Sequence, residues 1–346
     1  MKKANKSAIY GFITLAVLTV IFCGMRIFQI AWDVDRITGN LHSSAVNGIV
    51  VPITLIIVLI TGVVFYFLSP KKSIDTHIIH SIPLGASSLL LSASCLVDGI
   101  INYTDAKQSY NTLLTVTDEL VSASLQSSAR FVCDIALVAC IFSVFTAIYF
   151  IWLACTYLNK ASTKYPSPLL AVFIPLWVGL RLSGDYIQLT NSPVLTETIY
   201  DTLTLSALTV FMMSHIRFLS NIQRKNTVRS NFTFGFLSIL LALVFPIPRY
   251  VMENGFGYTI TSGSNLFNLV NFSAALYILL FLIYLENAEE SIDTPTGDTV
   301  AADTVPTQPN IINTANAEGT IPYDNTAIPP ELQSDDGNFD NGTNNF

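Results

Sequence analysis

The segment 169–191 is apolar enough to cross a bilayer, yet it contains two ionisable side chains, Arg181 and Asp185. Their four-residue spacing puts both on one face of a helix. At about 1.5 Å per residue, Arg181 lies roughly 18 Å into a hydrocarbon layer about 30 Å thick, where an ionisable group is costly and faces protein or water. The segment therefore indicates a functional site inside the membrane.

A further charge, Asp98, lies in the apolar stretch LSASCLVDG, one or two helical turns inside its end. No basic residue pairs with it on its own helix, and an isolated charge in hydrocarbon is costly. Asp98 is therefore expected to take a partner from another segment, either Arg181 or Arg26. Asn268 and Asn271 share one face of a later segment and add neutral hydrogen-bonding groups on the same side of the membrane.

Two other pairs repeat the arginine-to-acid spacing of four residues. Arg130 precedes Asp134, and Arg249 precedes Glu253, each near the end of an apolar segment. This spacing lets opposite charges meet on one helix. The main role expected of the two pairs is to neutralise charge near the lipid head groups, and Arg249 is in addition a predicted ligand contact.

The ionisable residues gather toward one side of the membrane, whereas the opposite halves of the segments hold almost none apart from His215. We interpret the charged side as an outward-facing polar bowl that binds a small polar or zwitterionic solute, for either sensing or transport. Arg181 would meet an anionic group, and Asp98 or Asp185 a cationic one. The predicted ligand-binding residues are Arg181, Asp185, Asp98, Arg26, Asp201, Arg249, Asn268 and Asn271.

Two other classes of function stay open. In the first, the chain is a structural or accessory membrane subunit without a ligand, and its ion pairs only hold helices together. In the second, which the residues favour less, Asp98 and Asp185 form the acid and base of an intramembrane aspartyl-type protease. Arg181 argues against the protease, because a neighbouring cation favours an ionised Asp185 that cannot share a proton.

Motifs for other chemistry are missing from the sequence. It contains no HExxH, no glycine-rich phosphate loop and no GxSxG, which are the patterns of metalloproteases, nucleotide hydrolases and serine hydrolases. The histidines and cysteines lack the spacing of a metal site. No catalytic residue, metal or cofactor is therefore predicted, and an enzyme is not favoured. Basic residues are spread among the connections, so nucleic acid is not expected as a partner.

The composition is typical of a membrane protein. Of 346 residues, 51% are hydrophobic and only 12% are charged, against roughly 25% charged in a soluble globular protein. The chain is expected to be an all-α polytopic helical bundle whose main partner is the lipid bilayer. Its eight apolar segments of spanning length are about 8–30, 48–68, 82–101, 134–157, 169–189, 198–217, 232–250 and 265–285.

Charge is unevenly distributed along the chain. Residues 1–285, the predicted transmembrane domain, hold all 17 Lys and Arg and half of the 24 Asp and Glu. Alternate connections each hold at least two basic residues, which by the positive-inside rule predicts a cell-membrane protein with both termini in the cytoplasm. Residues 286–346 hold the other acids and few apolar residues, so they are expected to form a disordered acidic cytoplasmic tail. The sequence predicts no oligomeric state.

Prolines and one long connection refine this expectation. Pro175, Pro246 and Pro248 lie within apolar segments, where proline removes a backbone hydrogen bond and bends a helix. The connection 102–130 carries leucines at near-helical spacing. It is expected to form an amphipathic helix that lies on the outer surface or extends the segment 134–157. Trp32 is expected at the outer membrane interface.

Overall fold

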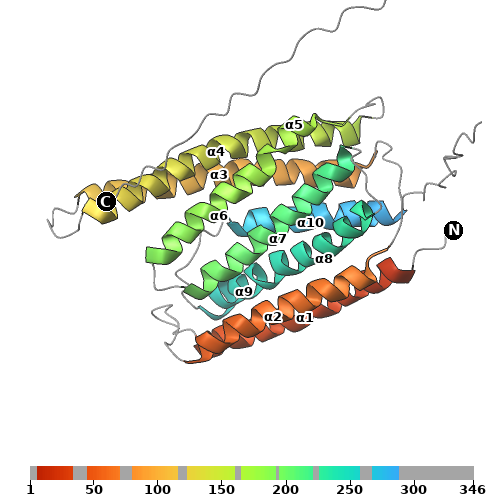
Figure 1. Ribbon diagram of the computed structural model, residues 1–346, viewed down its shortest axis with the longest axis horizontal. Coiled ribbons are helices and arrows are strands. Elements are labelled where there is room, and N and C mark those ends of the chain that lie inside the picture. Colours follow the sequence, from red (N-terminus) through yellow and green to blue (C-terminus); the bar gives the residue numbers. More distant parts are fainter. Residues whose placement is uncertain are drawn as a thin grey trace, which may run out of the picture. The chain divides into compact units, whose positions relative to one another are not determined.

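A computed structural model of the chain describes residues 6–33, 45–70, 80–115, 123–159, 165–191, 195–220, 226–257 and 267–287. All regular structure within these ranges is helical (Figure 1). The helices are α1 (Lys6–Asp33), α2 (Ala45–Leu68), α3 (Ile82–Thr115), α4 (Ala123–Leu158), α5 (Pro168–Ala171), α6 (Phe173–Asn191), α7 (Leu195–Leu219), α8 (Thr227–Val244), α9 (Pro246–Phe256) and α10 (Phe267–Asn287). The predicted tail lies almost wholly outside the described residues, so its disorder stays a prediction.

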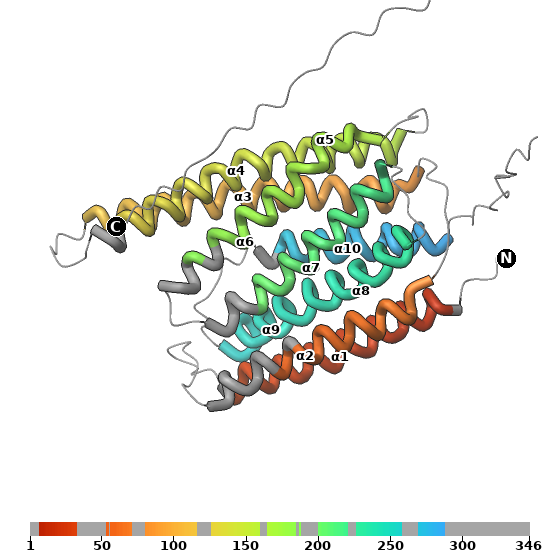
Figure 2. Tube along the Cα trace, in the orientation of Figure 1, coloured from red at the N-terminus to blue at the C-terminus, as the bar shows by residue number. Residues whose placement is uncertain are grey.

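The helices pack around α8 and α10. Helices α3 and α4 lie along each other on one side of the group, and α1 and α2 lie together on the other side (Figure 2). Between them, α8 contacts α1, α2, α7 and α10, and α10 also contacts α3. The largest fully buried side chains are those of Tyr149, Tyr157, Tyr200, Tyr277, Phe65, Phe150, Phe211, Phe232, Phe236, Phe281 and Ile30. Helices α1 and α2 therefore contact the rest of the group mainly through α8 and α9.

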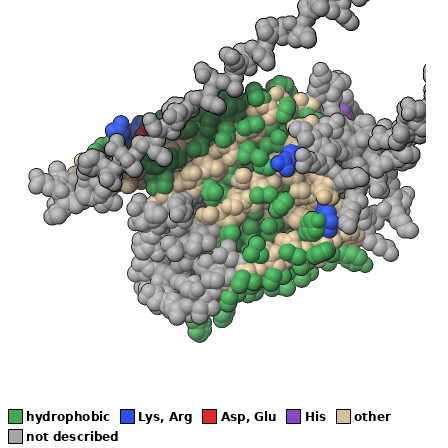
Figure 3. Space-filling view, in the orientation of Figure 1, with side chains coloured by type: hydrophobic (Ala, Val, Ile, Leu, Met, Phe, Trp, Pro, Cys, Tyr) green, Lys and Arg blue, Asp and Glu red, His purple; other side chains and the backbone are tan. Residues whose placement is uncertain are grey.

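Six of the described helical ranges are long and apolar enough to cross a membrane. They are Ser7–Trp32, Ile82–Thr115, Gln126–Leu158, Tyr200–Leu219, Thr227–Phe256 and Leu269–Asn287. Two shorter apolar ranges, Ile56–Leu68 and Pro168–Gly184, lie in α2 and in α5 with α6. Large hydrophobic side chains are exposed along the helices, and Figure 3 shows hydrophobic groups spread over one face. The chain thus has the multi-pass helical build of an integral membrane protein, as its composition predicts.

Two helices are interrupted where the sequence places prolines. Only Val172 separates α5 from α6, and only Phe245 separates α8 from α9. Pro175 and Pro248 have no N–H for the carbonyl one turn earlier, which lies next to the break in each case. The interruptions thus fall beside the prolines, and the ten helices of the described ranges form eight rods.

The α3 and α4 helices are longer than the predicted spans 82–101 and 134–157. The 34 residues of α3 extend for about 51 Å, roughly 20 Å more than a hydrocarbon core. The connection 102–130 has no proline or glycine to end a helix. It is therefore largely taken up by extensions of both helices, which confirms the predicted extension and excludes a separate helix in the described part.

Small residues bring α3 close to α4. A side-chain carbon added at Gly99 would lie 2.8 Å from Ser143 Cβ and closer still to Ser143 Oγ, so only glycine fits there. The hydroxyl groups of Ser88 and Ser92 donate hydrogen bonds to backbone carbonyls of α4, at 2.9 and 3.0 Å. Interhelical hydrogen bonds of this kind and close backbone approach are the usual means of helix association in membranes.

The C-terminal end of α2 is fixed by Arg229 of α8. Its Nε and Nη2 both donate to the backbone oxygen of Tyr66, at 3.0 and 2.8 Å, and its guanidinium lies 3.6 Å from the centre of the Tyr66 ring. The hydroxyl oxygens of Ser69 and Thr233 lie 2.9 Å apart beside it. Helix α2 is therefore tied to α8 at this end.

Candidate functional site

Arg181 of α6 forms an ion pair with Asp98 of α3. Arg181 Nη2 lies 3.5 Å from Asp98 Oδ1, and the two side chains are 8% and 2% exposed. The expectation that Asp98 takes its partner from another segment is thus confirmed. The cavity beside Arg181 has a volume of only about 10 Å³, which is about the space of one water molecule. The two charges face each other with no room for a solute between them.

The two predicted helix-end pairs differ. Arg249 Nε donates to Glu253 Oε1 at 3.0 Å on α9, so this pair is confirmed. No ion pair within the described residues joins Arg130 to Asp134, so this predicted pair is not formed. Both side chains are exposed on α4. An exposed pair gains at most about 1 kcal/mol, which the entropy cost of fixing the long arginine side chain offsets.

The other predicted ligand-binding residues lie in several places. Asn271 is buried, and within the described part of the chain its Oδ1 has no hydrogen-bond partner. Asp201 is half-buried on α7. The side chains of Asp185 and Asn268 lie outside what the structure describes. Arg26 lines a different cavity from Arg181, and the two cavities share no residue.

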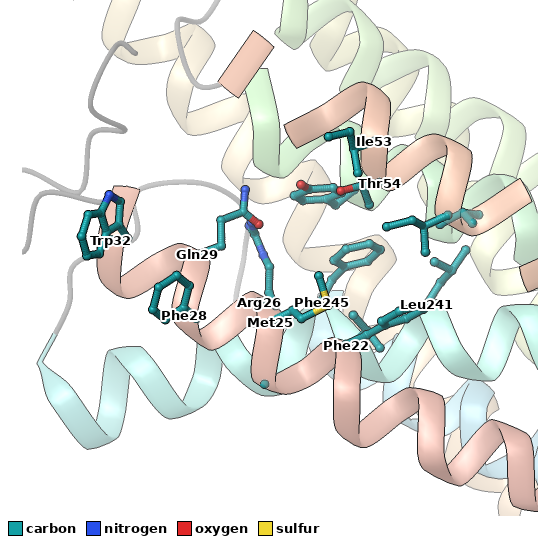
Figure 4. Close-up of a pocket in the computed structure, with 15 residues that line it drawn as sticks. Phe22, Met25, Arg26, Phe28, Gln29, Trp32, Ile53, Thr54, Leu241 and Phe245 are labelled. Atoms are coloured by element: carbon teal, nitrogen blue, oxygen red, sulfur yellow. The ribbon is translucent and has the colours of Figure 1, made fainter. Parts of the chain in front are cut away.

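The cavity at Arg26 lies between α1 and α2 and is closed by residues of α7 and α8 and by Phe245 (Figure 4). Its volume is about 550 Å³, within the range of about 300–1,000 Å³ that is usual for small-molecule sites. Most of its wall is hydrocarbon. It is lined by Phe22, Gly24, Met25, Arg26, Phe28, Gln29, Trp32, Ile53, Thr54, Ile57, Val58, Tyr200, Leu241, Val244 and Phe245.

Arg26 supplies the charge in this wall. Its side chain is buried, and its Nη1 donates to Gln29 Oε1 at 2.6 Å. Its guanidinium carbon lies 4.4 Å from the centre of the Tyr200 ring, which is a cation–π contact. Figure 4 shows the ends of Arg26 and Gln29 meeting beside the cavity. One residue from α1 and one from α7 therefore hold the guanidinium in place.

Tyr200 and Gln29 add hydrogen-bonding capacity that the described residues leave unused. Tyr200 is 1% exposed, and neither its hydroxyl nor Gln29 Nε2 has a hydrogen-bond partner in this part of the protein. A buried polar group without a partner costs about 1–3 kcal/mol. Gln29 Oε1 is already used by Arg26, so donors predominate here. The polar end of the cavity therefore suits an anionic or hydrogen-bond-accepting group.

Sequence reasoning found Arg26 and missed its two neighbours. Gln29 is three residues from Arg26, a spacing that puts both on one helical face, so it could have been included. Tyr200 comes from a helix far along the chain, and no pattern in the sequence links it to α1. Its contact with Arg26 follows only from the packing of α7.

The buried chain of His215, Tyr277 and Tyr157 was also missed. The Tyr277 hydroxyl lies 2.8 Å from His215 Nε2 and 3.2 Å from the Tyr157 hydroxyl, and all three residues are at most 1% exposed. These two hydrogen bonds join α7, α10 and α4. Because the three side chains are enclosed by the core, they stabilise the packing of these helices.

In comparisons with known proteins, no family model, no curated protein and no solved structure matches this chain. Within the residues that the structure describes, no group of three or more His, Cys, Asp or Glu side chains could hold a metal ion. The Arg26 cavity and the buried ion pairs are therefore the features that bear on function.

Proposed function

We propose that residues 1–285 form an eight-span domain of the cell membrane with both termini in the cytoplasm. Six described helices have spanning length and hydropathy, and the shorter apolar ranges of α2 and of α5 with α6 would supply two more crossings. The alternation of basic connections supports this orientation. Reporter fusions at both ends should give a cytoplasmic signal, and an external signal from either end would overturn the orientation.

We further propose that the protein binds a small molecule in its outer half, as a sensor or a carrier, with Arg26 as the contact for an anionic group. The observation that carries this proposal is a cavity of about 550 Å³ whose wall holds a buried guanidinium and hydrogen-bonding groups that the described residues leave unused. Arg181 and Asp98 of the predicted bowl pair with each other. Asp185, Asp201, Arg249, Asn268 and Asn271 stay predicted contacts.

The test is thermal unfolding of the purified protein against a panel of anionic, zwitterionic and neutral molecules, both soluble and amphiphilic. At least one molecule with an anionic group should raise the unfolding temperature of the unmodified protein. Arg26→Gln should lose that shift. Arg130→Gln removes an exposed charge outside the cavity, and it should keep the shift. If no molecule stabilises the unmodified protein, the binding function is rejected.

A structural or accessory subunit is the second candidate, and the interhelical ion pair favours it. Asp98 of α3 and Arg181 of α6 pair with each other, and both side chains are buried. Such a pair holds two helices in one arrangement whether or not a ligand binds. This candidate gains support if the panel gives no shift while loss of Asp98 or Arg181 still destabilises the protein.

A further inference from the structure

We propose that the molecule bound at Arg26 is an anionic amphiphile with one acyl chain, of the long-chain carboxylate class, which enters from the outer leaflet of the bilayer. This inference rests on the proposed binding function and assigns its ligand class. The acyl chain would lie between α1 and α2, and the carboxylate would meet Arg26.

Away from Arg26, the wall of the cavity is apolar. Phe22, Ile57, Val58, Leu241 and Val244 form its wall there and offer only hydrocarbon. A small water-soluble anion would leave this surface uncovered, whereas an acyl chain would bury it at about 25 cal/mol per Å² of apolar area. A cavity of about 550 Å³ matches a single small ligand. One acyl chain with its head group is therefore the better fit.

The cavity opens between α1 and α2, beside exposed apolar side chains. Met25, Phe28 and Trp32 of α1 and Ile53 of α2 line it and are 48–74% exposed. In a membrane-spanning helix, exposed side chains of this kind face lipid. The opening between α1 and α2 is thus bordered by groups that contact acyl chains, so a bilayer amphiphile can enter sideways.

The depth of Arg26 in the membrane suits the head group of an amphiphile. Arg26 precedes Trp32 by six residues on α1, or about 9 Å along the helix axis. Tryptophan favours the membrane interface, so Arg26 lies where the head group of an outer-leaflet amphiphile arrives when its chain points inward. Charge-assisted hydrogen bonds from a guanidinium to a carboxylate are among the strongest in proteins.

The polar end of the cavity favours a negatively charged head group. Arg26 brings only donors, Gln29 Oε1 accepts from Arg26, and Gln29 Nε2 and the Tyr200 hydroxyl lack partners among the described residues. A cationic amphiphile would meet the guanidinium with like charge. A neutral alcohol would forgo the ionic contact. The arrangement therefore selects a carboxylate over both.

Gly24 provides a way to block the cavity without disturbing its wall. It lines the cavity, and a side-chain carbon built at this position meets nothing within 4 Å. Gly24→Phe should therefore fold and fill the space of the acyl chain. Gly179 of α6 has the same freedom and lies outside the cavity wall, so Gly179→Phe is the matched control.

The experiment measures binding of radiolabelled myristate to the full-length protein in phosphatidylcholine nanodiscs, with empty nanodiscs subtracted. Saturable binding is expected. Gly24→Phe should abolish it and Gly179→Phe should retain it. Arg26→Gln should weaken it by about 10- to 100-fold, the usual effect of losing a charged hydrogen-bonding partner, whereas Arg130→Gln should leave it unchanged. Unfolding temperatures of all variants check that each is folded.

Competitors separate this inference from the function on which it rests. Excess unlabelled myristate should displace the label, and tetradecanol, tetradecyltrimethylammonium and acetate should do so at least tenfold less well. If acetate or another soluble anion alone binds through Arg26, the amphiphile is rejected and the binding function stands. If tetradecanol competes equally, or Gly24→Phe binds normally, the assigned ligand class is rejected. If no probe of any class binds, both proposals fail.

Discussion

Asp98 and Arg181 meet 3.5 Å apart inside the protein, although they come from helices more than 80 residues apart in the chain. Removing either member breaks a buried ion pair, which typically costs about 3–5 kcal/mol. Asp98→Ala and Arg181→Ala should each lower the free energy of unfolding by about that amount, measured by thermal or denaturant unfolding in detergent.

The double variant isolates the contact itself. Asp98→Ala with Arg181→Ala should cost clearly less than the sum of the single variants, because each single variant already loses the same contact. Additive costs would show that the two side chains act independently and would contradict the pairing.

Replacing Tyr277 by Phe should remove both hydrogen bonds of the His215 chain and leave two buried groups without a partner. The expected loss is about 1–3 kcal/mol of unfolding free energy. Tyr157→Phe removes only one bond and keeps the contact of Tyr277 with His215, so its loss should be smaller. Tyr250→Phe, at an exposed position, serves as the control. Equal effects for all three would argue against the chain.

Gly99→Ala should destabilise the α3–α4 contact by about 1–3 kcal/mol, the usual cost of overpacking, because the new methyl group would overlap Ser143. Adding Ser143→Gly should recover part of this loss. Gly179→Ala places a methyl group in open space and should be neutral or stabilising by up to about 1 kcal/mol. Thermal unfolding of the three variants tests the prediction, which falls if Gly99→Ala is as stable as Gly179→Ala.

Arg229→Lys should free the end of α2 even though it keeps the positive charge. Lysine cannot place two N–H groups and a planar cation on Tyr66 at once. Backbone amides in the last turn of α2 should exchange hydrogen about 10- to 100-fold faster, as expected for the loss of a charged hydrogen-bond donor. Amides of α4 provide the internal reference. Unchanged exchange in α2 would show that Arg229 does not fix this end.

Much of the fold could be predicted from the sequence because lipid imposes a simple rule on it. Runs of apolar residues of spanning length must be helices, since their backbone groups find no water. Prolines at 175 and 248 marked the two interruptions in the same way. The extensions of α3 to Thr115 and of α4 back to Ala123 were only partly foreseen, because polar residues outside the hydrocarbon give no hydropathy signal.

The candidate site was less predictable. The depth of Asp98 showed that it needed a partner from another segment, and the sequence left Arg181 and Arg26 as the two candidates. Depth alone could not show that these two charges would use each other and leave no cavity. The space at Arg26 arises from how α1 and α2 pack on α8, and that packing depends on side-chain shapes that no single-sequence pattern records.

The hydrogen bonds of Ser88 and Ser92 limit how this protein can move. A shift of α3 along α4 by one turn, about 5.4 Å, would pull both hydroxyls away from the carbonyls they contact at 2.9 and 3.0 Å. Sliding of the two longest helices past each other is therefore opposed by the loss of both bonds, about 0.5–1.5 kcal/mol each. If the proposed ligand binds at Arg26, we expect the motion that admits it to come from α1 and α2, which line that cavity.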